Sequence, residues 1–359
     1  MDRTPLVRKY MAVGIILLFV GTGIIPAIAL NTEKSLPASR GTWLYVGGSG
    51  PGNYTKIQDA VDNASNGDTV FVYRGIYTDY SLYNHACVEI IKSINLLGED
   101  REQTIISGPG DLWIQAIHID SSNVVVSGFT FQNPGYSEDD KIGYGIFICP
   151  YITNTSIYDN IIQENYYGIS ISIYCSVYIY NNIFTRNSEA IGGVDYSISE
   201  IFNNTITQND KGIRVSNNDY HIYTNQITNN SIGIEIWYVP SNIIIEHNHI
   251  QDNSIGIQIN NGITTIKENN FIENEKHIDL IIVTSLLFIS PFFKCRQTWN
   301  SNFWDDWNST QPRPIKGAWK ISINIRFFLH EYSFQIAKLP YTEYDKNPAQ
   351  EPYDIPEIG

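Results

Sequence analysis

A repeating pattern of apolar and polar positions, with a period near 22 residues, runs through the middle of the chain. Apolar residues lie three positions before, two after and nine after an asparagine anchor, and a second asparagine follows each anchor by five. The anchors are spaced by 22, 22, 21, 23 and 21 residues: Asn160, Asn182, Asn204, Asn225, Asn248 and Asn269. Self-similarity at this period predicts a solenoid of stacked repeats.

The repeats have β character. Ile169, Ile171 and Ile173 alternate with other residues, which predicts a strand with one buried face. Three short strands per repeat close a triangular coil, and successive coils stack about 4.8 Å apart. Residues at equivalent positions of successive repeats therefore lie directly above one another. We therefore expect isoleucine columns in the core. The asparagine columns are expected at corners, where asparagine tolerates left-handed backbone and forms hydrogen bonds along the stack.

Glycines mark another corner of the repeats, where we expect positive φ angles. They are Gly168, Gly212, Gly233 and Gly256. Before the repeats, Ile57, Ala60, Val61 and Ala64 have helical spacing and predict an amphipathic helix, followed by a strand over residues 69–72. Such a helix would cover the open apolar end of the first coil.

The repeated N-x-I-x-x-N-x-x-G-I-x-I string, together with residues 54–72, resembles the right-handed parallel β-helix repeat of the pectin-lyase-like superfamily. Within it, the chain is most similar to the NosD-like, carbohydrate-binding-and-sugar-hydrolysis group of archaeal surface proteins. The resemblance implies an all-β, single-stranded parallel β-helix of about ten coils, with an N-terminal capping helix and an irregular C-terminal cap. We expect the β-helix at residues 53–290, the cap at 291–359 and a linker at 30–52.

The first 29 residues have the pattern of a targeting segment. Arg3, Arg8 and Lys9 precede an apolar stretch over residues 12–25, and Ala27-Ile28-Ala29 is a small-x-small cleavage site. A cleaved signal peptide and an uncleaved membrane anchor both fit. Either one predicts a protein that is secreted or anchored at the cell surface, with membrane contact only through residues 1–29.

The chain is acidic, with a formal net charge of −14 at pH 7, which argues against nucleic acid as a partner. This charge suits cations or a neutral envelope polysaccharide. The four cysteines contain no C-x-x-C pair, so a zinc site is not expected. Cys149 and Cys175 lie about one coil apart, and two alternatives stay open: a disulfide between coils or two buried thiols.

One outward column forms a candidate glycan-binding strip. It contains Arg214, Glu235 and Gln258, flanked by the aromatic residues Tyr174 and Trp237. Aromatic faces stack on sugar rings, and charged groups bind their hydroxyls. The alternative is an exposed ion pair between Arg214 and Glu235 with ordinary surface aromatics.

Two acidic clusters are further candidates. Glu138, Asp139 and Asp140 lie on an insertion between early coils, and suit a catalytic pair, a calcium site or a solvated loop. Near the C-terminus, Asp305 and Asp306 lie between two tryptophans and suit a sugar or calcium site. Those tryptophans, Trp304 and Trp307, also suit the apolar cover that the last coil needs.

The resemblance to NosD proteins implies a role in copper-site maturation. His247 and His249 alternate and are expected to share one strand face, as copper ligands do. However, both methionines, Met1 and Met11, lie in the targeting segment, so no metal is expected and calcium is the one cofactor kept open.

The strings that carry activity in polygalacturonase-like and epimerase relatives are absent, among them Gly-Asp-Asp, Gly-His-Gly and Asp-Pro-His. The sequence therefore favours a non-catalytic protein that binds glycans or contributes to the envelope. A carbohydrate-active lyase or hydrolase and a NosD-like copper accessory remain as alternatives.

Overall fold

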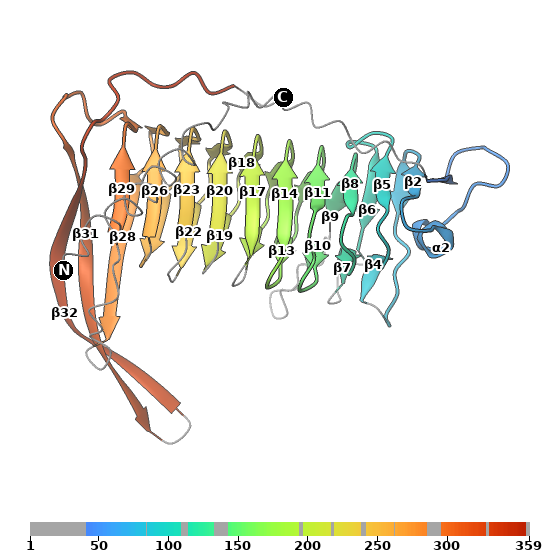
Figure 1. Ribbon diagram of the computed structural model, residues 1–359, viewed down its shortest axis with the longest axis horizontal. Coiled ribbons are helices and arrows are strands. Elements are labelled where there is room, and N and C mark those ends of the chain that lie inside the picture. Colours follow the sequence, from blue (N-terminus) through green and yellow to red (C-terminus); the bar gives the residue numbers. More distant parts are fainter. Residues whose placement is uncertain are drawn as a thin grey trace, which may run out of the picture. The chain divides into compact units, whose positions relative to one another are not determined.

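A computed structural model (Figure 1) describes residues 41–83, 85–108, 114–132, 143–193, 197–216, 219–237, 242–261, 263–285, 296–327 and 330–356. The predicted targeting segment and the Glu138–Asp140 cluster lie outside these ranges. Among the residues described, no helix combines the length and the apolar character needed to cross a membrane.

Three sheets of stacked strands form the sides of a β-helix of about nine turns, close to the ten expected. Sheet A contains β1 (Trp43–Val46), β2 (Thr69–Val72), β5 (Asn95–Gly98), β8 (Val125–Ser127), β11 (Thr155–Tyr158), β14 (Ser176–Tyr180), β17 (Ile198–Phe202), β20 (Asp219–Tyr223), β23 (Asn242–Glu246), β26 (Ile263–Lys267) and β29 (Arg296–Asn300). Sheet B contains β3 (Gly75–Tyr77), β6 (Thr104–Ser107), β9 (Thr130–Gln132), β12 (Ile161–Gln163), β15 (Ile183–Thr185), β18 (Thr205–Thr207), β21 (Gln226–Thr228), β24 (His249–Gln251), β27 (Asn270–Ile272) and β30 (Phe303–Trp304). Sheet C contains β4 (Ala86–Ile90), β7 (Gln115–Ile119), β10 (Tyr144–Ile148), β13 (Tyr167–Ile171), β16 (Glu189–Gly193), β19 (Lys211–Ser216), β22 (Ile232–Trp237), β25 (Ile255–Asn260), β28 (Lys276–Ser285), β31 (Arg313–Phe327) and β32 (His330–Asp345).

The isoleucine columns form the core, as predicted. In sheet C, Ile191, Ile213 and Ile234 are partners in successive parallel strands, and each side chain is at most 1% exposed. The register continues to Ile278, so one column crosses the whole regular part of the solenoid. Because every coil buries the same positions, the period of the sequence is also the period of the core.

The asparagine columns form hydrogen-bonded ladders, as predicted. The side-chain N–H of Asn182 donates to Oδ1 of Asn204 on the next coil at 3.1 Å, and also to the Ile157 carbonyl at 2.9 Å. The left-handed backbone lies one residue earlier than expected: Asn181 and Asn203, which precede the ladder residues, have φ angles of 56° and 52°. The ladder asparagines thus satisfy buried carbonyls at a corner that the preceding residue turns.

The predicted positive φ angles at the glycine column are wrong. None of these glycines lies in the left-handed region, and they are required for close approach instead. A Cβ atom on Gly212 would lie 2.4 Å from the Gly233 carbonyl oxygen, and one on Gly233 would lie 2.6 Å from that of Gly256. The glycines therefore allow neighbouring coils to stack closely at this corner.

Both ends of the solenoid are covered. Helix α2 (Ile57–Asn63) buries Ile57, Ala60 and Val61 at the first coils, which confirms the predicted capping helix. Strand β1 pairs with β2 and lies within the segment expected to be a linker.

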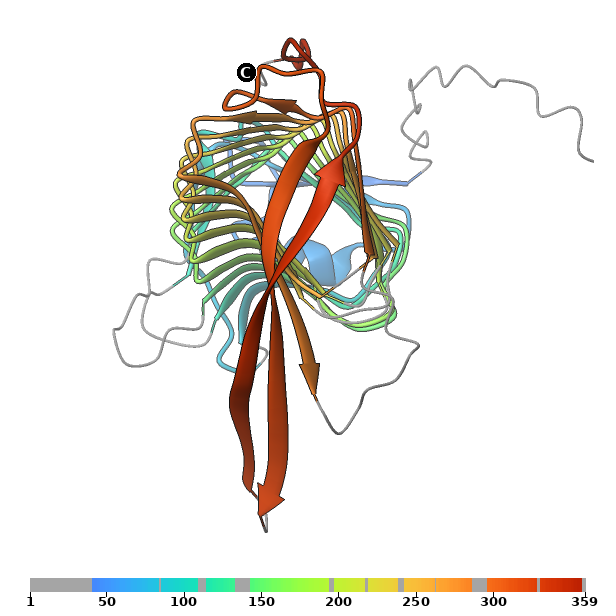
Figure 2. The ribbon, with the colours of Figure 1, turned by 90° about the vertical axis from the view of Figure 1, so that its left-hand side faces the viewer.

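At the other end, the cap contains a regular element that the sequence did not predict, because β31 and β32 form a long antiparallel hairpin (Figure 2). Strand β31 also continues sheet C beside β28. Trp304 packs on Phe271 with ring centroids 4.3 Å apart and is 1% exposed, so it contributes to the apolar cover of the last coil.

Candidate functional site

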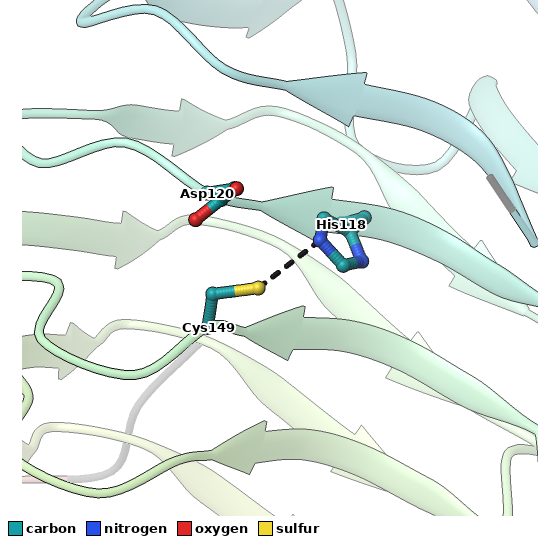
Figure 3. Close-up of side chains that lie close together, drawn as sticks. All are labelled: His118, Asp120 and Cys149. Carbon is teal, nitrogen blue, oxygen red and sulfur yellow. Dashed lines mark hydrogen bonds between the residues drawn. The ribbon is translucent and has the colours of Figure 1, made fainter.

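His118, Asp120 and Cys149 lie together on the outer side of sheet C (Figure 3). They lie near the edge of the sheet that is formed by its first strand, β4. His118 belongs to β7, where Ile117 and Ile119 point into the core and the alternation turns His118 outward. Asp120 follows β7, and Cys149 follows the neighbouring strand β10. Two adjacent coils therefore supply the three side chains.

The donor atoms of the three residues lie within 4.8 Å of one another. His118 Nε2 and Cys149 Sγ are 3.1 Å apart. Asp120 is exposed, whereas His118 and Cys149 are half-buried, and the Phe147 ring lies 5.6 Å from the imidazole. The site is thus walled on one side and open to solvent on the other.

Gln115 determines which imidazole nitrogen is available. Its Oε1 lies 2.5 Å from Nδ1 of His118, and because a carboxamide oxygen only accepts, Nδ1 carries the proton. Nε2 therefore presents its lone pair toward Cys149, whose thiol donates to it. A second residue that fixes the tautomer in this way is characteristic of metal-binding histidines.

Burial determines the protonation states of the Cys149 thiol and the His118 imidazole. It raises the pKa of the Cys149 thiol to about 12, and the negative charge of Asp120 adds to the shift. Burial also lowers the pKa of His118, although Glu89 and Asp120 oppose this change. At neutral pH the site therefore holds a neutral imidazole and a protonated thiol, whose proton a metal would displace. Imidazole and thiolate together suit copper or zinc, and the residues fit such an ion.

His277, Asp305 and Asp306 also cluster, beside the cap, but the asparagine ladder makes this histidine a poor ligand. Nδ2 of Asn274, held in orientation by its bond to the Ile250 carbonyl, lies 3.2 Å from Nδ1 of His277. Nδ1 must accept, so Nε2 carries the proton and donates to Asp305 at 2.9 Å. Burial lowers the pKa of His277, which keeps the ring neutral.

The predicted histidine pair is not assembled. His247 lies after the end of β23 with a φ angle of 53°, whereas His249 belongs to β24 in another sheet. His247 lies 3.3 Å from Glu268, and His249 lies 2.6 Å from Gln251. Glu246, near His247, is already paired with Lys267 and His221.

The predicted strip is largely satisfied internally. Arg214 and Glu235 are partners on adjacent strands, as expected, but Glu235 is 3% exposed and also binds Lys211 at 2.7 Å. Arg214 also pairs with Glu189. Burial raises the pKa of Glu189, and the Arg214 charge opposes part of this shift. Gln258 follows Glu235 in the column and donates to Asp279. These contacts form a charge network in which the carboxylates of Glu189 and Glu235 are buried and the basic groups are partly exposed.

The aromatic members of the strip lie apart. Trp237 is 41% exposed, and the Arg214 guanidinium lies 6.0 Å from its ring centroid. Tyr174 instead stacks on Tyr151 at 5.2 Å, after β13 and three strands away from the Trp237 strand in sheet C. The structure therefore places Trp237 but not Tyr174 beside the charged residues.

In the terminal cluster, Asp305 binds His277 and Asp306 binds Arg313 in a bidentate pair, so both carboxylates have cationic or donor partners. Trp307 is half-buried and donates to the Gln311 carbonyl.

Cys149 and Cys175 lie on adjacent coils, as their spacing predicted. Both are free, and the Cys175 thiol donates to the Cys149 carbonyl at 3.1 Å.

Sequence reasoning missed the His118 site. Its signal was a His-x-Asp pair on one strand face and a cysteine one coil later, but the intervening insertion hides the period between residues 120 and 149.

Comparison with known proteins gives a family and a fold. A family model described as "Periplasmic copper-binding protein (NosD)" matches residues 61–308, more than half of the chain. The mannuronan C-5 epimerase A-module of Azotobacter vinelandii is similar with a TM-score of 0.53 and 16% identity, over 69% of this chain and 81% of that one. A pectin methylesterase from carrot gives a TM-score of 0.49 and 14% identity, over 66% and 84%. The likeness to the epimerase module shows a shared fold. Comparison with curated proteins gives no match.

Proposed function

The chain belongs to the NosD family, and on this premise we propose that it binds copper outside the cytoplasm through His118, Asp120 and Cys149. The family description names both copper and the periplasm. The predicted targeting segment at residues 1–29 agrees with export, after which the protein is either free or anchored. The sequence-based expectation of no metal is replaced by this proposal.

The observation that carries the proposal is the 3.1 Å approach of the Cys149 thiol to an imidazole nitrogen that carries no proton. Thiolate sulfur and imidazole nitrogen suit both copper and zinc, and the family description favours copper. The thiolate also supplies one negative charge, which balances a copper(I) ion, and the Asp120 carboxylate offers a third donor atom. Bound copper would supply a soft, exchangeable Lewis-acid centre at this position.

The surrounding residues hold the ligands in place. Gln115 orients the imidazole, and hydrogen bonds between adjacent coils fix the backbone on both sides of Cys149. The exposure of Asp120 leaves one side of the site open, as transfer of an ion to or from a partner requires. This geometry suits a carrier of copper rather than a closed structural site.

Competition for copper(I) against a coloured chelator tests the proposal. The purified chain should retain one equivalent of copper, and Cys149→Ser and His118→Gln should each weaken binding about 10- to 100-fold. Cys87→Ala is the matched control, because Cys87 is a buried thiol in β4 whose sulfur contacts the Ser107 carbonyl. Equal affinity in all four proteins would exclude this site.

Glycan binding remains the second candidate, as the sequence suggested. The observation in its favour is Trp237, whose exposed ring lies beside Arg214 on a rigid strand. A β-helix spaces such side chains evenly, which suits an extended polymer.

A further inference from the structure

Three lysines, Lys316, Lys320 and Lys338, lie together at the base of the C-terminal hairpin. The arginines of the regular solenoid pair with acidic residues, as Arg186 does with Glu164 and Arg214 with Glu189. Among the described residues, no ion pair joins Lys316, Lys320 or Lys338 to a carboxylate. In a chain of net charge −14, this is a local reversal: residues 313–346 carry six lysines and arginines against three acidic residues.

The strand register brings these lysines together. Lys316 and Lys320 are four residues apart in β31, so their side chains lie on the same face of the strand. Lys320 is the direct antiparallel partner of Lys338 in β32. Like charges directly opposite each other destabilise a strand pair. The fold therefore maintains a repulsive contact that an anion would relieve.

The lysines surround a hollow of about 470 Å³ between β28, β31 and β32. Gly317 and Ala318 are among its lining residues, and Ala318 lies between the two lysines of β31 on the same face. Lys276 also lines the hollow and pairs with Asp279, so the carboxylate among the described lining residues already has a cationic partner. Lys316 and Lys338 are exposed and Lys320 is half-buried, which leaves their ammonium groups accessible.

From this arrangement we infer that the hollow, defined by Lys316, Lys320 and Lys338, binds a phosphate-bearing ligand. Three ammonium groups offer point charges and up to nine N–H donors to the oxygens of a phosphate or diphosphate group. The volume lies in the range of small-molecule sites and exceeds what a single phosphate needs. A soluble phosphate ester and the headgroup of a phospholipid share this chemistry.

A structural alternative explains the lysines differently. Strand β32 is the outer edge of sheet C, and edge strands commonly carry lysine to prevent pairing with other chains. That alternative needs charge on β32 but does not explain the hollow or the facing lysine on β31. It predicts aggregation, and no loss of ligand binding, when the lysines are removed.

Two probes, inorganic pyrophosphate and vesicles of phosphatidylglycerol in phosphatidylcholine, separate the soluble source from the lipid source. Calorimetry with pyrophosphate and co-sedimentation with vesicles should be carried out on the full chain, on Lys316→Gln/Lys320→Gln/Lys338→Gln, and on Lys56→Gln/Arg74→Gln/Arg186→Gln. The last variant removes the same charge from exposed, paired positions. Thermal melting of all three proteins controls for folding.

The inference predicts binding of at least one probe, weakened about 5-fold for each hollow lysine removed and hardly changed in the control variant. Binding of pyrophosphate would assign a soluble ligand, and binding of vesicles alone would assign a lipid headgroup. Either outcome is independent of copper binding at His118. Failure of both probes, equal loss in the two variants, or aggregation of the hollow variant without any binding by the wild type would overturn the inference.

Discussion

Asn302 donates its side-chain N–H to the carboxylate of Asp345 at 3.1 Å. This bond ends the ladder of the anchor asparagines, which runs through Asn269 to Asn302. Asp345 is fully buried and is the last residue of β32. The backbone N–H of Asn302 and the indole N–H of Trp304 donate to the same carboxylate oxygen. The hairpin thus replaces the missing next coil with a single acceptor.

Replacing Asp345 should weaken the cap. Asp345→Ala leaves three buried donors without their acceptor, at about 1–3 kcal/mol for each unsatisfied group, so we expect a loss of about 3–5 kcal/mol in the free energy of unfolding. Asp345→Asn retains a carbonyl oxygen and should lose less than half of that. Urea denaturation measures both, and equal stability of the alanine variant and the wild type would show that the ladder does not need this end.

The register of the core predicts a second result. Ile213→Asp places an unpaired charge in a side-chain position that is 0% exposed, and should cost more than about 4 kcal/mol. Ile198→Asp is the matched control, because Ile198 is 62% exposed on β17, and it should cost less than about 1 kcal/mol. Similar melting temperatures for the two variants would contradict the assignment of inward and outward positions.

The core register, on which the second prediction rests, and the ladder, on which the first depends in part, could be derived from the sequence alone. Asn182 and Ile213 recur with the repeat, so their partners on the next coil follow from counting. The His118 site could not be derived, because its partner Cys149 lies beyond an insertion that breaks the count. The hairpin was missed for a related reason: Asp345 completes a ladder from outside the repeats, and nothing local to its sequence marks it as the next rung.

The glycine column shows a different limit. Position alone identified Gly212 and Gly233 as corner residues, but two physical causes, a positive φ angle and close packing, select glycine equally well. The distance from a Cβ atom to the next coil distinguishes them, and that distance depends on how coils stack rather than on local sequence.

Thiol reactivity should depend steeply on pH at Cys87. Burial, with the nearby Asp79, raises the pKa of this thiol to about 12, and the thiolate is the reactive form. Alkylation by iodoacetamide at pH 8 should therefore be at least about 100-fold slower in the folded protein than in urea, and should accelerate as the pH rises toward 12. Mass spectrometry of time points gives both rates. Labelling at the unfolded rate would mean that Cys87 is accessible and ionised.

The glycan proposal has its own test. Trp237→Ala should weaken binding to any polysaccharide that the protein retains by about 5- to 10-fold, because sugar stacking on the exposed ring is lost. The melting temperature should stay within a few degrees, since the side chain is 41% exposed. Tyr174→Ala is the control, because Tyr174 lies apart from Arg214. Affinity electrophoresis in gels containing candidate polysaccharides would show the effect, and no retardation of the wild type would remove the strip from consideration.

X-ray absorption at the copper edge tests the central claim most directly. In the copper-loaded protein, the account predicts one sulfur scatterer and one imidazole, supplied by Cys149 and His118. Cys149→Ser should lose the sulfur contribution, and Cys87→Ala should leave the spectrum unchanged. A spectrum with only nitrogen and oxygen scatterers, or a sulfur contribution that survives in Cys149→Ser, would contradict copper binding at this site.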